Sequence, residues 1–501
     1  MRETADISEG PRRAVIDIGS NTVRLVVYGG NPRSPIVVWN EKVTAKLGEQ
    51  VAKTGSLDLA AMDEALAALR RYRLLLDQLA VEETSVLATA AARDADNGRH
   101  FLDEVRAIGF EPNLLPGEEE ARIAATGVVG AFPSGRGLVA DLGGGSLELV
   151  PIDRGAVHAG VSLQLGTLRL AALEEEIGAG KLKAKLAKLV KKAGVDADRV
   201  DDLYLVGGTW RAFASYVLAQ RGSAIDDPHG LALPASEAVK IAKKLARSRP
   251  DKIAAMQGVS SMRAAKLPNA AKLLQVLVEQ YEPQALVVSA WGLREGWLYD
   301  RLQPLARAAD PLLAGVTNYA APRGGDPSLA SRIAGWTASA QPDECRGDER
   351  LRLAATQLAL ATMTVEPNLR LPHALNVALL KRWVGVDFTG RAMLAAALGA
   401  NCGADCPPEL GEIADDRALA EATAWGLAMR LFRRLGGNAR STLVATRLTK
   451  KDGALVLTFA EDYAALCNAG VEKDLGKLAD ALKLRPEIAF RPMRELARLD
   501  D

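Results

Sequence analysis

The sequence predicts an α/β protein with two homologous domains facing each other across a cleft, followed by a mostly helical C-terminal domain. Three observations carry this prediction. Apolar, β-rich runs alternate with helical periodicity through roughly the first 300 residues, as in α/β layers with crossover helices. One apolar-Asp-Gly motif occurs twice, a domain length apart. After about residue 305, a Pro/Gly-rich stretch, Ala321 to Pro327, leads into long Ala/Leu-rich helical segments.

The composition indicates an ordinary globular protein. With 501 residues, 48% hydrophobic and 25% charged, the chain is expected to hold about three domains, and disordered and fibrous classes are excluded. We place these domains at residues 1–133, 134–304 and 305–501, with a hairpin and tail after about 438. The net charge of +1 supplies no overall field that would attract nucleic acid, so any anion site must be local.

The N-terminal residues and the cysteines indicate the cellular compartment in which we expect the protein. Residues 1–13 carry charges of both signs without an apolar signal-peptide core, and no uncharged apolar run approaches the ~18 residues that span a membrane. We therefore expect a cytoplasmic protein with no membrane span. The cysteines are too few for a disulfide framework and lack the spacing of a zinc site, so we expect four reduced thiols: Cys345, Cys402, Cys406 and Cys467.

Local patterns give the expected elements. The predicted strands are Ala14–Ile18, Thr22–Tyr28, Ser85–Ala88, Gly137–Asp141, Leu147–Ile152, Leu203–Val206 and Ala285–Ser289. The predicted helices of this region are Asp58–Leu79, Glu118–Val129, Ser261–Gln280 and Gly292–Leu302. Near the C-terminus, Ser441–Arg447 and Ala454–Phe459 are predicted to form a β-hairpin through Lys451-Asp452-Gly453.

An internal repeat is the most informative feature. Val15–Val26 aligns with Val139–Val150, pairing like with like or small with small except at Arg24 and Glu148. The offset of 124 residues, from Asp17 to Asp141, is the size of a domain rather than a solenoid period. We infer two homologous α/β domains that open with the same hairpin.

The repeated hairpin has the chemistry of a phosphate site. Its glycine-rich turn exposes successive backbone N–H groups, which bind phosphate oxygens without side-chain charge. The Asp at the strand end, Asp17 or Asp141, would repel phosphate directly, so its natural role is to hold a divalent cation or the cation's waters. Two ordinary tight hairpins are the alternative. A third glycine turn, Gly207-Gly208-Thr209, precedes a helix start and fits either an anion or a simple N-cap.

Seven motifs, in order, resemble the exopolyphosphatase and guanosine pentaphosphate phosphohydrolase family. The family belongs to the actin, Hsp70 and sugar-kinase superfamily, in which two ribonuclease-H-like domains clamp phosphates. The resemblance covers roughly residues 14–302. The motifs are DIGSNTVRL, TAAARDADN from Thr89, PGEEEAR from Pro116, DLGGGSLEL, LGTLRL from Leu165, VGGT from Val206 and SAWGLREG from Ser289.

The resemblance implies roles for individual residues. Glu120 is the candidate general base, with Glu119 as the fallback, although carboxylates also occur at helix starts for dipole reasons alone. Arg93 would clamp the terminal phosphate, and Glu148 would join the metal shell with Asp17 and Asp141. The expected cofactor is Mg²⁺ or Mn²⁺, with a monovalent cation such as K⁺. The expected phosphate-binding residues are Gly19, Ser20, Asn21, Thr22, Arg24, Gly143, Gly144, Gly145, Ser146, Gly207, Gly208, Thr209 and Arg263.

Two departures from the family pattern stand out. Relatives commonly read Arg-Ala-Asp where this chain has Arg263-Ala264-Ala265, which puts the role of that Asp in doubt. The C-terminal portion resembles a domain related to metal-dependent HD phosphohydrolases. However, no histidine is followed by Asp, and only His373 lies in that region, so an HD metal centre is excluded. We expect a binding role and a homodimer contact for that region.

The predicted function is Mg²⁺-assisted, processive hydrolysis of the terminal phosphate of inorganic polyphosphate. Guanosine pentaphosphate, cleaved to the tetraphosphate, presents the same phosphoanhydride and is the nearest alternative. The extra C-terminal domain favours the longer ligand. ADP as acceptor, a sugar kinase or ATP-driven machine, and a sensor that binds polyphosphate or alarmones without turnover are the remaining hypotheses.

Overall fold

The computed structural model describes residues 11–195, 200–343 and 345–496, which form two compact units. The large unit comprises the described residues up to Gly222 together with Pro228–Pro311. The C-terminal unit comprises Ser223–Asp227 and the described residues from Leu312 onward. Within the described ranges, no helix has the length and apolar character needed to cross a membrane.

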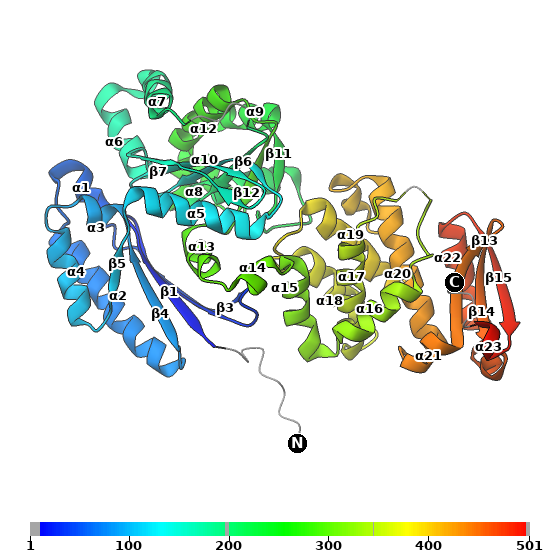
Figure 1. Cartoon of the computed structure of the whole chain (residues 1–501). Helices are drawn as coiled ribbons and strands as arrows, with labels where there is room; N and C mark the ends of the chain where they lie inside the picture. Colours follow the sequence, from blue (N-terminus) through cyan, green and yellow to red (C-terminus); the bar gives the residue numbers. More distant parts are fainter. Residues whose placement is uncertain (1–10, 196–199, 344, 497–501) are drawn as a thin grey trace. The chain divides into compact units, whose positions relative to one another are not determined.

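The first lobe of the large unit is built on a five-stranded mixed sheet in the order β3-β2-β1-β4-β5 (Figure 1). Its strands are β1 (Arg13–Ile18), β2 (Val23–Gly29), β3 (Ile36–Val43), β4 (Glu83–Ala88) and β5 (Pro112–Leu114). Its helices are α1 (Gly48–Thr54), α2 (Leu59–Gln78), α3 (Ala90–Asp94) and α4 (Gly98–Ala107). Apolar side chains of α2 and α4 pack with those of β1, β2 and β4 in one core cluster.

The second lobe repeats this plan with two differences: β8 and β9 both pair with β7, where β3 alone pairs with β2, and β11 is an added edge strand. Its sheet has the order β11-β12-β10-β6-β7-β8, and β9 also pairs with β7. The strands are β6 (Arg136–Leu142), β7 (Leu147–Asp153), β8 (Ala156–Val157), β9 (Val161–Leu163), β10 (Asp202–Val206), β11 (Ala232–Pro234) and β12 (Ala285–Ser289). The helices are α6 (Thr167–Ile177), α7 (Ala179–Ala193), α8 (Gly208–Arg221), α9 (Ala235–Leu245), α10 (Pro250–Ala254), α11 (Ser261–Ala264) and α12 (Leu267–Tyr281).

The strand register confirms the internal repeat. β1 and β2 are antiparallel with Asp17 opposite Arg24, and β6 and β7 are antiparallel with Asp141 opposite Glu148. In each lobe the first strand also pairs in parallel with the strand that follows the crossover helices. Every strand predicted in the first 300 residues is present to within two residues. The helix predicted over 261–280 is broken at Ala265 and Lys266 into α11 and α12.

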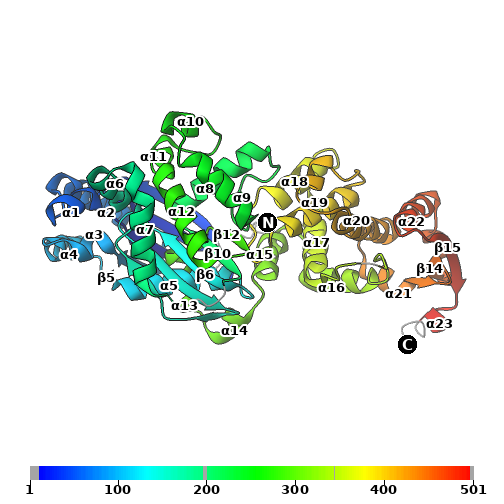
Figure 2. The same cartoon turned by 90° about the horizontal axis from the view of Figure 1, so that it is seen from above.

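Two helices lie between the sheets of the two lobes: α5 (Gly117–Ala131) and α13 (Leu293–Asp300) (Figures 1 and 2). Chain order would assign α5 to the first lobe, yet it packs on the second sheet with Val139, Val150 and Tyr204. Trp297 and Leu298 of α13 pack on the first sheet together with Ile123 of α5, and Tyr299 of α13 packs on the second. Each of the two helices therefore contacts both sheets and joins the lobes. A short helix, α14 (Pro304–Ala308), follows.

The C-terminal unit is mostly helical, as predicted. Its helices are α15 (Pro311–Ala320), α16 (Pro327–Trp336), α17 (Glu349–Ala361), α18 (Arg370–Leu379), α19 (Phe388–Cys402), α20 (Asp416–Gly436), α21 (Arg440–Ala445), α22 (Ala469–Ala481) and α23 (Met493–Leu496). The core centres on α19, whose residues from Gly390 to Asn401 are all buried.

All four cysteines are free, as predicted. The relation of this region to HD phosphohydrolases and the homodimer stay predictions.

The C-terminal hairpin differs in part from its prediction. Its turn is as expected, since Asp452 and Gly453 have φ of 49° and 72°, the left-handed pair that a two-residue hairpin turn requires. However, the segment predicted as the first strand begins with the helix α21, and strand β13 spans Thr446–Lys451. β14 (Ala454–Ala460) lies between β13 and β15 (Arg485–Arg491). The apolar run over 441–445 is therefore a helical turn that precedes the strand.

Candidate functional site

A cleft of about 580 Å³ lies between the two lobes of the large unit. The ends of both repeated hairpins, the third glycine turn and the first turns of α5 and α13 contribute to its wall. Most of the site residues expected from the sequence line it. They are Asp17, Gly19, Ser20, Asn21, Thr22, Arg24, Glu120, Asp141, Gly143, Gly144, Gly145, Ser146, Glu148, Gly207, Gly208, Thr209 and Arg263.

The two hairpin turns have the same geometry and touch each other. Gly19 N–H donates to the Thr22 carbonyl at 3.0 Å, and Gly143 N–H donates to the Ser146 carbonyl at 3.0 Å. A Cβ added to Gly145 would lie 2.9 Å from Ser20 Oγ. A side chain at this position would therefore displace Ser20 Oγ and crowd Ala90, whose Cβ would lie 3.0 Å away. The result is two backbone loops that converge on one volume.

Each turn is held by the start of a nearby helix. In the second lobe, the amides of Gly166, Thr167 and Leu168 donate to the carbonyls of Gly145, Gly143 and Gly144 at 2.9–3.2 Å. In the first lobe, the amides of Lys46 and Gly48 donate to Asn21 and Ser20 at 3.1 and 2.7 Å. These bonds occupy the carbonyl oxygens of the turns, which favours an electropositive, amide-lined surface toward an anion.

The third glycine turn brings a helix start to the same cleft. Gly207 has φ of 112°, and a Cβ there would lie 2.5 Å from the Leu142 carbonyl oxygen, so both conformation and space require glycine. Helix α8 begins at Gly208 and presents its positive end here. The Arg263 guanidinium lies beside Gly208, 3.1 Å from where a Cβ would be. The turn thus has the features of an anion site.

Four carboxylates gather at one end of the cleft. Burial raises the pKa of Glu120 to about 7, although Arg93 opposes the shift, and Asp141 and Asp17 raise it further. Burial likewise raises the pKa of Asp141 to about 6 against the effect of Arg211. Burial, with Glu120 and Asp141 nearby, raises the pKa of Glu148 well above its usual value. All four groups line the same cleft, where protons or a cation would offset their charge.

Arg93 is not among the residues that line the cleft but contacts Glu120, which is, and its role as a phosphate clamp stays a prediction. Its Nη1 donates to Glu120 Oε2 and to the Leu115 carbonyl, both at 2.9 Å, and its Nε donates to Asp94 Oδ1 at 3.3 Å. Nη1 and Nε of the guanidinium therefore contact protein groups. In this geometry Arg93 holds the Glu120 carboxylate in place and opposes its protonation.

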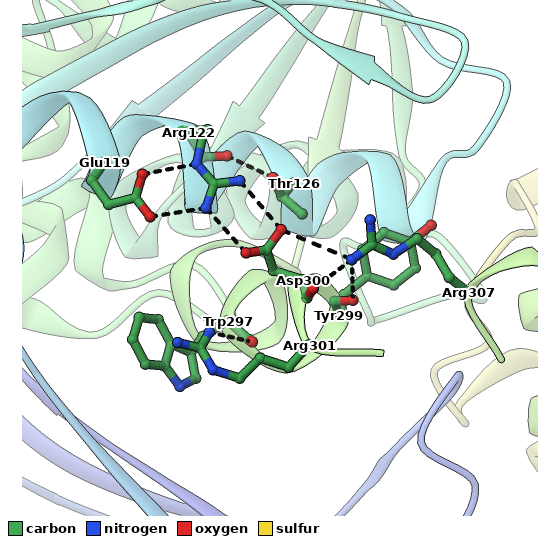
Figure 3. Close-up of polar contacts among 8 residues, drawn as sticks. All are labelled: Glu119, Arg122, Thr126, Trp297, Tyr299, Asp300, Arg301 and Arg307. Carbon is green, nitrogen blue, oxygen red and sulfur yellow. Dashed lines mark hydrogen bonds and ion pairs between the residues drawn. The ribbon is translucent and has the colours of Figure 1, made fainter. Parts of the chain in front are cut away.

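Glu119 lies outside the cleft. Its carboxylate accepts two hydrogen bonds of 2.8 Å from Arg122, which also donates to Asp300 (Figure 3). The hydrogen bond from Arg122 lowers the pKa of Glu119. The side chain of Glu119 is 40% exposed, against 12% for Glu120. The structure thus places the preferred candidate, Glu120, in the cleft and the fallback, Glu119, outside it.

Arg294 is a site residue that was not expected from the sequence. It lies in the SAWGLREG motif, lines the cleft, and places Nη1 3.6 Å from Asp17 Oδ2. Burial raises the pKa of Asp17, and Arg294 opposes that effect most strongly. Behind it, Tyr28 Oη donates to Glu295 Oε1 at 2.7 Å. The sequence signal that could have identified Arg294 is its charged side chain within a mostly uncharged motif.

The carboxylates fit a magnesium ion that relies on substrate and water for part of its shell. Among the described residues, no group of three or more His, Cys, Asp or Glu side chains is arranged to hold a metal ion by itself. Mg²⁺ prefers one or two carboxylates together with waters and phosphate oxygens. Asp17 and Asp141, at the ends of equivalent strands beside the glycine turns, offer such a set.

The raised pKa values predict an unusual pH dependence of stability. Glu120 and Asp141 bind protons more tightly in the folded than in the unfolded protein, so their contribution is present at low pH and lost as pH rises through about 6 and 7. The free energy of unfolding of the metal-free protein should therefore fall between about pH 4, the ordinary carboxyl pKa, and about pH 7, by at most ~1.4 kcal/mol per pH unit and group. Thermal unfolding across this range measures it. Glu120→Gln should flatten the profile, and an equal slope in both proteins would contradict the assignment.

Comparison with known proteins agrees with this geometry. The model of the Ppx/GppA phosphatase family matches residues 26–305. Retrograde regulation protein 2 of Saccharomyces cerevisiae is 28% identical over 437 residues, covering 78% of this chain and 73% of that protein. Exopolyphosphatase 1 of Mycobacterium tuberculosis is 27% identical, covering 58% of this chain and 88% of that protein. A guanosine-5'-triphosphate,3'-diphosphate pyrophosphatase of Aeromonas salmonicida is 27% identical, covering 58% of this chain and 60% of its own length.

A solved structure shows the same architecture. The crystal structure of the Aquifex aeolicus Ppx/GppA family member covers 57% of this chain and 96% of its own, with a TM-score of 0.50 and 28% identity. The predicted pair of actin-like α/β lobes is therefore confirmed. The matched share of this chain corresponds in size to the large unit.

Proposed function

The chain belongs to the Ppx/GppA phosphatase family, and from this premise we propose that it is an exopolyphosphatase, releasing the terminal phosphate of inorganic polyphosphate. The observation that carries the proposal is the convergence of two glycine turns on a cleft that holds a buried, proton-accepting Glu120. The rest of the lining is rich in glycine, hydroxyl and charged side chains, which suit phosphate oxygens better than an apolar ligand.

The proposed reaction is hydrolysis of one phosphoanhydride bond. The amides of both hairpin turns and the start of α8 bind the oxygens of the terminal phosphoryl group and neutralise charge that develops on them. Glu120 accepts a proton from the attacking water, whose oxygen bonds to the terminal phosphorus as the bridging P–O bond breaks. A base whose pKa is about 7 suits this task near neutral pH. The products are orthophosphate and a chain shorter by one phosphate.

Further residues support these steps. Asp17 and Asp141 would hold Mg²⁺, with Glu148 in its outer shell. When bound, the ion would polarise phosphate oxygens and offset their charge. Arg93 keeps Glu120 oriented through its 2.9 Å hydrogen bond. Ser162 Oγ donates to Glu148 Oε1 at 2.9 Å and orients that carboxylate.

Phosphate release with and without Mg²⁺, from long-chain polyphosphate and guanosine pentaphosphate side by side, tests the proposal. We expect rapid, Mg²⁺-dependent release from polyphosphate. A higher kcat/KM on guanosine pentaphosphate would replace the proposal with the second candidate, which similarity to the Aeromonas relative supports to the same degree. No release from either substrate would reject hydrolysis and leave a binding role.

A further inference from the structure

Two of the sequence motifs contain charged residues to which the proposed reaction assigns no role. Asp94 follows Arg93 in the TAAARDADN motif and is the last residue of α3, in the first lobe. Arg169 lies in the LGTLRL motif, in the first turn of α6 in the second lobe. The structure brings the two together, because Arg169 Nη2 donates to Asp94 Oδ2 at 3.2 Å. This ion pair therefore crosses the boundary between the lobes.

The Asp94 carboxylate is shared between two guanidinium groups. Its Oδ1 accepts from Arg93 Nε at 3.3 Å, while its Oδ2 accepts from Arg169. Arg93 in turn donates from Nη1 to Glu120 Oε2 at 2.9 Å. A continuous series of contacts between opposite charges thus runs from α6, through α3, to the carboxylate proposed as the base. The four side chains are only 12–24% exposed, so water screens these contacts less than it screens surface ion pairs.

Arg169 also lies on the helix whose start holds the second glycine turn. The three residues directly before it, Gly166, Thr167 and Leu168, donate their amides to the carbonyls of that turn. The ion pair with Asp94 therefore fixes this helix start relative to α3, while α3 holds Glu120 through Arg93. One set of contacts thus connects the proposed base with a turn that we propose to bind the terminal phosphoryl group.

We propose that Asp94 and Arg169 are positioning residues, whose ion pair joins the lobes and, through Arg93, holds the Glu120 carboxylate in place against the bound phosphoryl group. This inference rests on the proposed function, since it takes Glu120 as the base. Asp94 and Arg169 are not among the residues that line the cleft, so they act through Arg93 rather than on the substrate. The position of the base matters because a displacement of about 1 Å in a reacting group can cost ~100-fold in rate.

Neutralising the two residues separately and together tests this role. Asp94→Asn and Arg169→Gln should each lower kcat for phosphate release from polyphosphate about tenfold and leave KM within about twofold, because the substrate loses no contact. The double variant should lose no more than Asp94→Asn alone, since both changes break the same ion pair. Asp103→Asn and Arg106→Gln are matched controls: they break an exposed 2.7 Å ion pair within α4 and should behave as wild type. Unchanged kcat in Asp94→Asn, or losses that multiply in the double variant, would overturn the proposal.

The same changes in a Glu120→Gln protein separate positioning of the base from general damage to the site. If Asp94 acts through Glu120, then Asp94→Asn should lower the residual rate of the Glu120→Gln protein by less than about twofold, because no base remains to be positioned. A further tenfold loss in this background would show that Asp94 acts by another route and would reject the positioning role.

Thermal unfolding, which needs no turnover, separates failure of this role from failure of the proposed function. Asp94→Asn and Arg169→Gln should each lower Tm by about 2 °C, and the double variant should lie below the sum of the two losses. If the wild type hydrolyses nothing but the Tm losses are non-additive, the ion pair joins the lobes, and the positioning of a base falls with the proposed function. If hydrolysis is confirmed and kcat is unchanged in both variants, the positioning role falls alone.

Discussion

Glu120→Gln should lower Mg²⁺-dependent phosphate release from polyphosphate at least ~100-fold, the scale of losing a general base. Glutamine keeps the size of the side chain and an oxygen that can accept from Arg93, but it cannot take a proton from water. The change should therefore appear in kcat rather than in binding. Initial rates of phosphate release at saturating polyphosphate measure it.

The neighbouring glutamates are matched controls for this experiment. Glu118 is exposed on the same helical turn, and Glu119 pairs with Arg122 outside the cleft (Figure 3). Glu118→Gln and Glu119→Gln should each keep kcat within about twofold of wild type, since surface changes away from a site have small effects. A 100-fold loss in Glu119→Gln, with Glu120→Gln active, would reverse the assignment of the base.

Gly296→Ala should destabilise the large unit strongly, because the added methyl group would meet the backbone of a neighbouring helix. A Cβ at this position would lie 1.9 Å from the Ile123 carbonyl oxygen and 2.9 Å from Gly127 N, both on α5. Because backbone atoms cannot rotate away, α13 and α5 must separate. Overpacking of this kind costs about 1–3 kcal/mol or more, which exceeds the ~1 kcal/mol that alanine gains over glycine in a helix.

The same displacement should reduce activity, because α5 carries Glu120 and α13 carries Arg294. Thermal unfolding and residual phosphate release measure the two effects together. Gly180→Ala on α7 is the control, since its added Cβ would meet no atom within 4 Å, and it should be neutral or slightly stabilising. Wild-type stability and activity in Gly296→Ala would show that the helices are less tightly apposed than the structure indicates.

Much of the fold could be predicted because its signals are local. The alternation of apolar residues with glycine turns located the strands to within two residues, and the repeat predicted two equivalent hairpins whose registers match. Local signals failed where packing against another segment of the chain decides the secondary structure. Residues 441–445 are apolar and β-branched enough to suggest a strand, yet they form α21. β3 and β5 have little apolar alternation and are defined by their pairing with β2 and β4.

Some residues of the candidate site could likewise be predicted from the sequence, and others could not. Asp17, Asp141 and the glycine turns are readable in sequence because a turn's backbone conformation is a property of consecutive residues. Which of three consecutive glutamates enters the cleft is a property of how α5 packs, since successive helical residues point about 100° apart. The resemblance implies a phosphate clamp at Arg93, and this role stays a prediction. The structure adds the contacts of its guanidinium with Glu120, Leu115 and Asp94.

The sequence by itself thus determined the family, the repeated phosphate-turn hairpins and the carboxylates at their strand ends. Each of these features depends on residues that are adjacent in the chain, so it can be predicted from motifs and their spacing. Only the tertiary structure decided the direction of the individual side chains and the groups they contact. It separated Glu119 from Glu120, and it brought Asp94 of one lobe into contact with Arg169 of the other. Such juxtapositions arise from packing between lobes, which no local pattern encodes.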